Sequence, residues 1–183
     1  MLKELERKLL AELIKNSRRS DRELAKAIGA SQPTTTRLRS KLEKEGYIRE
    51  YTIIPNFCKI GYSIMALNLL KFDPKLNHEH IEVFRKTHPE TIGRDPFGVI
   101  FIQRGMGLGY DATIISLHQN YSSYDAFRSY VKTAMGASIT EMSTFLINLE
   151  EEKSILPLTL AFLAVQLLKP DNKSKNRNNN RLL

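Results

Sequence analysis

The sequence has few of the residues on which extracellular scaffolds, metal sites and catalytic centres depend. Its single cysteine, Cys58, excludes an intramolecular disulfide framework and favours a reducing compartment. The N-terminus, MLKELERKLL, has charges spaced through it and lacks the apolar segment of a secretory signal. The four histidines form no ligand cluster, and no set of acid, base and nucleophile emerges. We therefore expect a cytoplasmic protein that is not an enzyme and needs no metal or cofactor.

The chain also lacks an apolar run long enough to cross a membrane. Residues 155–168 (ILPLTLAFLAVQLL) have only Thr159 and Gln166 as polar side chains, but they are 14 residues where a bilayer needs about 20. We expect an apolar C-terminal helix within residues 151–169, buried against the sheet or a partner chain, with membrane attachment as the alternative. The polar residues 170–183 are expected to form a disordered basic tail.

Positive charge is unevenly distributed along the chain. Residues 1–62 have 14 Lys/Arg against 8 Asp/Glu, whereas residues 63–150 have 8 against 9 and residues 151–183 have 6 against 3. The excess that makes the whole chain +8 therefore lies at its two ends. This asymmetry indicates a polyanion-binding head on a neutral module, although a solvated basic surface would also account for the charge alone.

Three short helices are predicted at the start of the chain. Apolar residues at helical spacing predict the first over residues 2–15. Ser20-Asp21-Arg22-Glu23 forms a capping box for a second helix, which Gly29 ends in the left-handed conformation. Ser31 is the expected cap of a third helix, which stops at Gly46.

A β-rich segment, residues 47–54 (YIREYTII), follows the third helix and is bounded by a proline. We expect it to form a short strand pair, or wing. Three helices with a glycine turn between the second and third, followed by a wing, predict a winged helix-turn-helix DNA-binding domain over residues 1–54.

The third helix is the candidate reading helix. If Thr35, Leu38 and Leu42 face inward, short polar and cationic side chains face outward. The residues expected to contact bases or nearby phosphates are Gln32, Thr34, Thr36, Arg37, Ser40 and Lys41. Those expected to contact phosphates are Arg18, Arg19, Arg22 and Arg49. The alternative is a solvated face with helical ion pairs, and Lys41 beside Glu45 fits that alternative.

After a linker over residues 55–62, the pattern changes to strands alternating with helices. Strands are predicted over residues 63–72, 98–103, 110–117 and 139–149, and helices over 78–87 and 123–134. The βαββαβ order predicts a ferredoxin-like domain over residues 63–150, so the fold class is α+β. Val99 and Phe101 are expected on one face and Ile100 and Ile102 on the other. A sheet that is apolar on both faces, with helices on one, predicts a homodimer.

The run SDRELAKAIGASQPTTTRLRSKLEKEGYIREYTIIPNFCKIGY resembles the DNA-binding domain of the Lrp/AsnC family, the leucine-responsive and asparagine-synthetase regulators, especially its archaeal branch. The elements that match are Leu24-Ala25, Gly29, the Ser31 cap and residues 42–48 (LEKEGYI). The βαββαβ module is similar in layout to the amino-acid-sensing domain of that family. The resemblance implies a dimeric transcription regulator that assembles further into tetramers or octamers.

The resemblance also implies that the hairpin between the second and third strands binds a small effector, often an amino acid, between subunits. The matching stretch is residues 104–112 (RGMGLGYDA), in which Gly107, Gly109 and Asp111 are the candidate effector-binding residues. The alternative is a plain hairpin turn that uses glycine for positive φ.

The leading hypothesis is a dimeric, sequence-specific double-stranded DNA-binding transcription regulator, with an amino acid or other small molecule as effector. The alternative is that residues 63–150 act as a small-molecule sensor, enzyme subunit or partner-binding module, and that the helix-turn-helix head only scaffolds.

Overall fold

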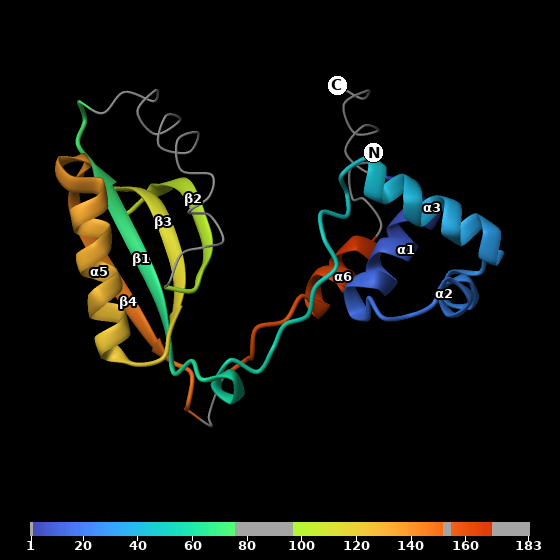
Figure 1. The fold of residues 1–183 in the computed structure, drawn as a ribbon. Helices are drawn as coiled ribbons and strands as arrows, with labels where there is room; N and C mark the ends of the chain where they lie inside the picture. Colours follow the sequence, from blue (N-terminus) through green and yellow to red (C-terminus); the bar gives the residue numbers. More distant parts are fainter. Residues whose placement is uncertain (1, 76–96, 152–154, 170–183) are drawn as a thin grey trace, which may run out of the picture. The chain divides into compact units, whose positions relative to one another are not determined.

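The structure is a computed structural model that describes residues 2–75, 97–151 and 155–169. The helix predicted over residues 78–87 and the tail predicted over 170–183 lie outside the described residues. The chain divides into two compact units: Met1–Ile54 with Leu156–Leu183, called the helical unit here, and Pro55–Ile155, called the sheet unit (Figure 1).

The helical unit contains α1 (Glu4–Lys15), α2 (Asp21–Ile28), α3 (Gln32–Lys44) and α6 (Ala161–Leu168). Ser20 and Glu23 form the predicted capping box of α2. Gly29 ends α2 at φ 71°, a left-handed conformation that glycine adopts at little cost. Ser31 caps α3, where its side chain accepts a hydrogen bond from Thr34 N. The three predicted helices and the glycine turn of the helix-turn-helix are therefore confirmed.

One apolar cluster holds α1, α2 and α3 together. Its fully buried members are Leu9 of α1, Leu24 of α2 and Leu42 of α3, each 0% exposed. Each helix therefore places one face in a common core, and the opposite face of α3 is left at the surface.

The predicted wing is not a pair of strands. Residues 47–54 contain no strand in the structure, and most of them are exposed. The backbone N–H groups of Tyr47 and Ile48 donate instead to Leu42 O at the end of α3. Residues of high β propensity form a strand only where a partner strand takes up their backbone groups, and none of the described residues does so here.

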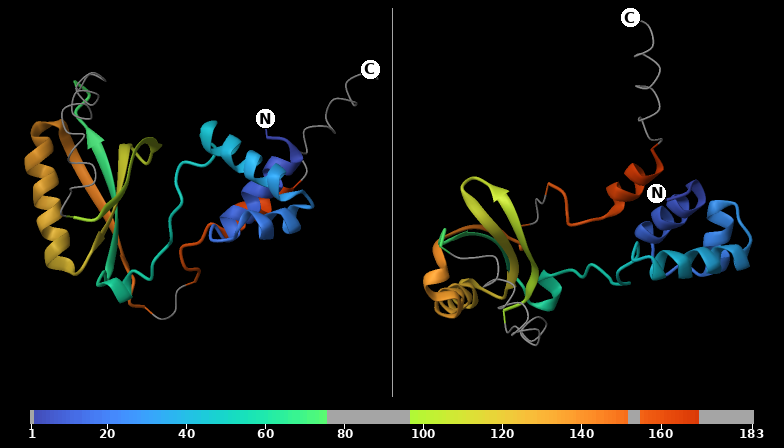
Figure 2. Two further views of the ribbon diagram at one scale, coloured as in Figure 1. Left: turned by 45° about the vertical axis from the view of Figure 1, so that its right-hand side comes forward. Right: turned by 90° about the horizontal axis from the view of Figure 1, so that it is seen from above.

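The C-terminal helix differs from its prediction in length and in its packing partner. The helix α6 begins at Ala161 rather than near residue 155. Pro157 disfavours helical backbone at the residue before it, and Thr159 Oγ1 accepts a hydrogen bond from Ala161 N at 3.1 Å. Instead of packing on the sheet, α6 lies beside α1 in the views of Figures 1 and 2.

Two contacts define how α6 packs on α1. Ala164 is 0% exposed, and Arg7 Nε of α1 donates to Leu167 O at 2.8 Å. Arg7 also donates to Lys169 O, so one guanidinium satisfies backbone carbonyls at the end of α6. No helix among the described residues is long and apolar enough to cross a membrane.

The sheet unit is a four-stranded antiparallel sheet with α5 (Tyr121–Met135) on one face (Figure 1). Its strands are β1 (Ile64–Phe72), β2 (Val99–Gly107), β3 (Tyr110–His118) and β4 (Ile139–Asn148), in the order β2-β3-β1-β4. Short 3-10 turns lie at Cys58–Ile60, within the predicted linker, and at Gly136–Ser138. The four predicted strands and the α+β fold class are therefore confirmed.

The face of the sheet under α5 is the core of this unit. Leu70 of β1 and Phe127 of α5 are each 1% exposed. Beneath the helix, Asn68 Nδ2 donates to Ser116 Oγ at 3.2 Å, and Ser116 Oγ lies 2.8 Å from His118 Nε2. These hydrogen bonds limit the cost of placing polar side chains in an apolar core.

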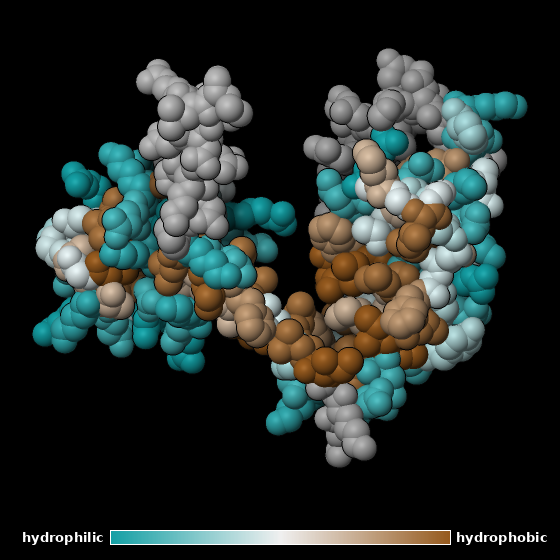
Figure 3. All heavy atoms as spheres, turned by 180° about the vertical axis from the view of Figure 1, so that it is seen from behind, coloured by the Kyte–Doolittle hydropathy of each residue, from teal (hydrophilic) through white to brown (hydrophobic). Residues whose placement is uncertain are grey.

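The opposite face of the sheet is apolar, and we call it the open face because large apolar side chains of the described residues are exposed there. Leu67 of β1 pairs with Ile115 of β3 and with Phe145 of the edge strand β4, and Phe145 is 69% exposed. The predicted alternation in β2 is corrected by a register shift: Val99 pairs with Ser116 and Phe101 with Ile115, so the two side chains lie on opposite faces. In the rear view of Figure 3, hydrophobic side chains gather over this unit.

The packing of α6 leads to a stability prediction. Ala164→Asp places a charge in the fully buried contact with α1, and we expect a loss of about 2–4 kcal/mol in the unfolding free energy of the helical unit. Phe162→Asp is the matched control, because Phe162 lies on the same helix and is 61% exposed. Denaturant unfolding followed by circular dichroism measures both. Equal losses for the two variants would contradict the packing of α6 on α1.

Candidate nucleic-acid interface

The surface of α3 that faces away from the core carries a row of exposed side chains. Thr35 and Leu42 face inward and are 0% exposed. Pro33, Arg37, Ser40 and Lys44 recur at spacings of three and four on the opposite side, and all are exposed. We call these four residues the outward row. Among the residues that the structure describes, the side chains of Gln32, Arg37, Ser40 and Lys44 make no hydrogen bond or ion pair and are thus free for a ligand.

Lys41, on the flank of this row nearer α1, is held by an ion pair. Its ammonium lies 2.7 Å from Glu6 Oε1, and the Glu6 side chain is only 5% exposed. Glu6 Oε2 also accepts from Lys3 N at 2.7 Å. The hydrogen bond from Lys41 holds the pKa of the Glu6 carboxyl below its ordinary value, and the same contact raises the pKa of Lys41. Glu45 lies farther from the ammonium, at 3.6 Å.

Asp21, the first residue of α2, holds the other flank of α3. Its Oδ2 accepts from Thr36 Oγ1 at 2.6 Å, and its Oδ1 lies 2.9 Å from Arg39 Nη1. Arg39 Nη2 also donates to Arg19 O at 3.3 Å. Because Asp21 contacts two side chains of α3 that are three residues apart, it limits rotation of α3 about its own axis.

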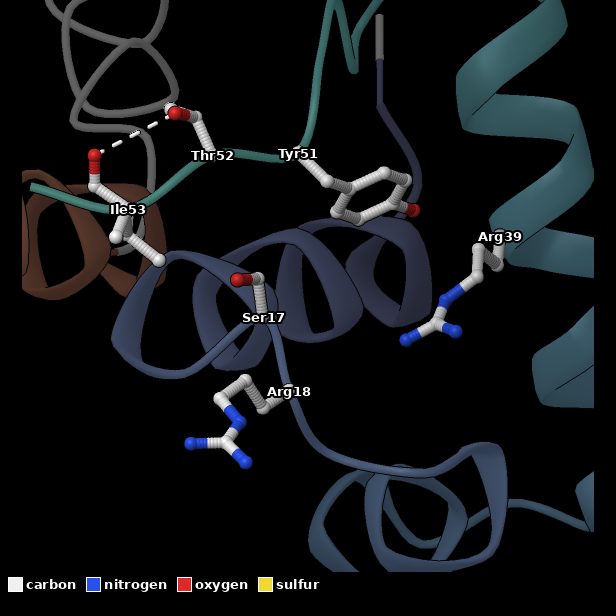
Figure 4. A pocket seen from close by; sticks show the side chains of 6 residues that line it. All are labelled: Ser17, Arg18, Arg39, Tyr51, Thr52 and Ile53. Atoms are coloured by element: carbon white, nitrogen blue, oxygen red, sulfur yellow. Dashed lines mark hydrogen bonds between the residues drawn. The ribbon is translucent and has the colours of Figure 1, made fainter.

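Tyr51 connects the segment after α3 back to that helix. Its hydroxyl donates to Glu43 Oε1 at 2.7 Å, and the Arg39 guanidinium lies 5.7 Å from the ring centroid. Burial, and then the hydrogen bond to Glu43, raise the pKa of Tyr51 to about 12. Arg39 and Tyr51 line a shallow hollow of about 310 Å³, shown with its other residues in Figure 4.

Neither Arg39 nor Tyr51 was among the candidate residues from the sequence. Arg39 lies four residues after the buried Thr35, so it lies at the edge of the inward face of α3. This spacing is the signal in the sequence that could have identified it. For Tyr51 the sequence contained no such signal, because its contacts depend on the path of an irregular segment.

The candidate phosphate contacts differ in how free they are. Arg18, Arg22 and Arg49 are exposed. Arg19 forms an ion pair with Glu12. Thr34 Oγ1 accepts from Ser31 Oγ at 2.9 Å, so the cap of α3 already uses it. All ten candidate DNA contacts belong to the helical unit.

A second hollow lies between α1 and α3 beside the candidate interface. Its volume is about 460 Å³, and Glu6, Arg37 and Lys41 are among the residues that line it. The carboxylate of Glu6 supplies the negative charge there and already has its cationic partner. Of the α3 residues that line this hollow, Lys41 is paired with Glu6, whereas Arg37 has no ion-pair partner among the described residues.

The candidate effector loop is the turn between β2 and β3. Gly107 and Gly109 have φ of 142° and 79°, and Leu108 between them has φ 53°. Asp111 Oδ2 accepts from Phe72 N at 2.9 Å, so this carboxylate already binds the backbone of β1. Within the described residues, no group of three or more His, Cys, Asp or Glu side chains could hold a metal ion.

The ion pair between Glu6 and Lys41 leads to a pH prediction. The pKa of Glu6 is lowered in the fold from 4.5, so its carboxylate stabilises the helical unit above that pH, and this stabilisation is lost as pH falls through the folded pKa. We expect the thermal stability of Glu6→Gln to fall less than that of the unchanged chain between about pH 5 and about pH 3. Glu45→Gln, at the longer distance from Lys41, is the control and should behave as the unchanged chain. A Glu6→Gln curve parallel to that of the unchanged chain would contradict the role of this pair.

The chain is similar to known DNA-binding proteins in its helical unit and beyond it. Residues 2–49 match the family model described as winged helix-turn-helix DNA-binding. An HTH-type transcriptional regulator from Pyrococcus abyssi is 27% identical over 157 residues, covering 86% of this chain and 100% of the relative.

Solved structures extend the likeness to the sheet unit. An AsnC family transcriptional regulator from Agrobacterium tumefaciens has a TM-score of 0.68 at 22% identity, covering 88% of this chain and 99% of that one. A transcriptional regulator from Neisseria meningitidis in complex with L-Met has a TM-score of 0.66 at 18% identity, covering 89% and 99%. Residues 2–49 therefore belong to a winged helix-turn-helix DNA-binding domain, and the chain as a whole has the fold of Lrp/AsnC family regulators.

Proposed function

We propose that the helical unit binds double-stranded DNA sequence-specifically by inserting α3 into the major groove. The observation that carries this proposal is the set of unpartnered polar side chains on the exposed side of α3, on a helix whose two flanks are held by Glu6 and Asp21. Arg37 is suited to bidentate bonding with guanine, Gln32 to adenine, and Ser40 to either a base edge or a phosphate. Lys44 adds positive charge near the C-terminal end of the helix.

The exposed arginines supply the contacts that do not depend on sequence. Arg18, Arg22 and Arg49 are free to meet phosphates, and such contacts fix the register of a protein on the duplex. Arg19 and Lys41 are already paired with Glu12 and Glu6, and a contact with phosphate would weaken or replace those ion pairs. We therefore assign these two residues smaller contributions to DNA affinity. Thr34 supports the turn that begins α3, where a recognition helix approaches the bases most closely.

We propose that the protein acts as a homodimer or a higher even oligomer through the open face of the sheet. Phe145 and Phe101 are 69% and 46% exposed on that face, and contiguous exposed apolar surface is characteristic of interfaces. A two-fold axis through it would supply two copies of α3 for two half-sites of a pseudo-palindrome.

We propose an amino acid as the effector of this assembly, at the turn between β2 and β3. The Neisseria meningitidis structure named in complex with L-Met has the same fold and supports this class of ligand. The exposed backbone N–H groups around Gly107 and Gly109 suit a carboxylate. Because Asp111 is bonded to Phe72 N, it contributes to the shape of the turn more than as a free carboxylate.

The groove assignment predicts the effect of removing a free cation. Arg37→Ala should weaken binding to a selected DNA site by about 1–3 kcal/mol and relax base preference at one position, as expected for a lost bidentate contact. Fluorescence anisotropy at several salt concentrations measures both. Lys132→Ala, in the last turn of α5, is the control for one lost positive charge. Lys41→Ala is a poorer test, because it leaves Glu6 buried without its cation. Unchanged affinity in Arg37→Ala would exclude this face of α3.

The oligomer and effector proposals share one variant. Phe145→Asp places a charge on the open sheet face, so light scattering should give the monomer mass. The variant should also give no calorimetric heat with any amino acid that the unchanged protein binds between subunits. Tyr121→Asp, at the start of α5 and 59% exposed, is the control and should remain an oligomer. A Phe145→Asp protein that keeps its oligomeric mass would contradict the proposed interface, and one that becomes a monomer but still binds the amino acid would contradict the effector site.

A further inference from the structure

Thr36 is an exposed residue of α3 whose hydroxyl is already held by a hydrogen bond within the protein. It lies between Gln32 and Ser40, four residues from each, and so shares with them a strip along the helix surface. Its side chain has two groups that a DNA base could meet, a hydroxyl and a methyl. A hydroxyl bonds base edges or phosphates, whereas a methyl makes apolar contact with the 5-methyl group of thymine.

The hydroxyl of Thr36 is already engaged. Oγ1 donates to Asp21 Oδ2 at 2.6 Å, and it also lies 3.1 Å from Gln32 O one turn earlier on the helix. A single O–H has one hydrogen, and a carboxylate is the stronger acceptor. To donate to a base or to a phosphate, the hydroxyl would have to leave a charge-assisted bond.

Asp21 is itself held in place. Its other oxygen lies 2.9 Å from Arg39 Nη1, and the side chains of Asp21 and Arg39 are 18% and 23% exposed. The Arg39 guanidinium is in turn bonded to Arg19 O. Thr36 Oγ1 therefore meets a fixed acceptor, and a carboxylate at that position also repels a DNA phosphate.

We infer that Thr36 is a specificity-determining residue that reads thymine through its methyl group, with Asp21 and Arg39 as positioning residues. This inference rests on the proposed insertion of α3 into the major groove. Because the hydroxyl hydrogen is directed to Asp21, Oγ1 has only acceptor lone pairs left for a base. Thymine presents an acceptor and a methyl group in the major groove, so Cγ2 is the atom of this exposed side chain that can contact it. One buried methyl pair contributes about a fourfold difference in affinity.

The experiment begins with selection of a binding site for the full-length protein from random double-stranded DNA. Each thymine of that site is then replaced in turn by uracil, which removes only the 5-methyl group. We expect one replacement to weaken binding of the unchanged protein by about fourfold. Thr36→Val keeps a methyl group and should retain this preference, whereas Thr36→Ser keeps the hydroxyl and should bind the thymine and uracil sites equally.

The positioning role is tested by Asp21→Asn, which keeps the shape of the side chain but removes the charged acceptor. We expect the thymine preference to fall while the salt dependence of binding becomes steeper, because Arg39 loses its acidic partner. A general loss of folding would not produce this pattern. Thermal unfolding of each variant checks that the helical unit remains folded.

The possible results test the Thr36 inference and the proposed DNA binding separately. If no DNA site is enriched, the proposed function is overturned. If a site is enriched but no uracil replacement changes the affinity, the methyl contact is overturned and DNA binding stands. If Thr36→Ser keeps the thymine preference, or Thr36→Val loses it, the methyl group of Thr36 does not read the thymine and the inference is overturned.

Discussion

The placement of α3 depends on two acidic side chains from the helices beneath it. Asp21 at the start of α2 bonds Thr36 and Arg39, and Glu6 of α1 bonds Lys41. The two carboxylates hold opposite flanks of the helix, and the buried Leu42 holds its inner face. A helix fixed on three sides presents one strip of its surface, because rotation in either direction would break an ion pair.

The same contacts divide the cations of α3 into two kinds. Lys41 and Arg39 neutralise acids within the protein, whereas Arg37 and Lys44 have no partner among the described residues. Net charge alone would count all four as equivalent. Only the unpaired ones release counterions from DNA without first giving up an internal bond, so the charge that acts on a polyanion is smaller than the formal charge of the region.

The chain passes between its two units twice, so the helical unit contains two segments that are distant in the sequence. The first passage follows Ile54 and the second precedes Leu156, after which α6 packs on α1. The DNA-binding unit is thus built from both ends of the chain, with Ala164 filling a fully buried position in it. Loss of the C-terminal segment would remove α6 and would also expose to solvent the surface of α1 on which α6 packs.

Local chemistry made several features predictable from the sequence. The Ser20 capping box, Gly29 and the Ser31 cap act within a few residues, so they specify the helix boundaries wherever the segment lies. Strand periodicity likewise predicted β1 and β4, because side chains in a strand alternate whatever the strand packs against.

The tertiary structure decided what depends on partners distant in the chain. Lys41 bonds Glu6 across 35 residues, Thr36 bonds Asp21 across 15, and Arg7 bonds the end of α6 across 160. Residues 47–54 have the composition of strands but no partner strand among the described residues, and so they remain irregular. The sequence by itself determined where the helices and strands form and that α3 has a polar outer face. Which side chains of that face remain free for a ligand was decided only when folding brought the acids of α1 and α2 beside it.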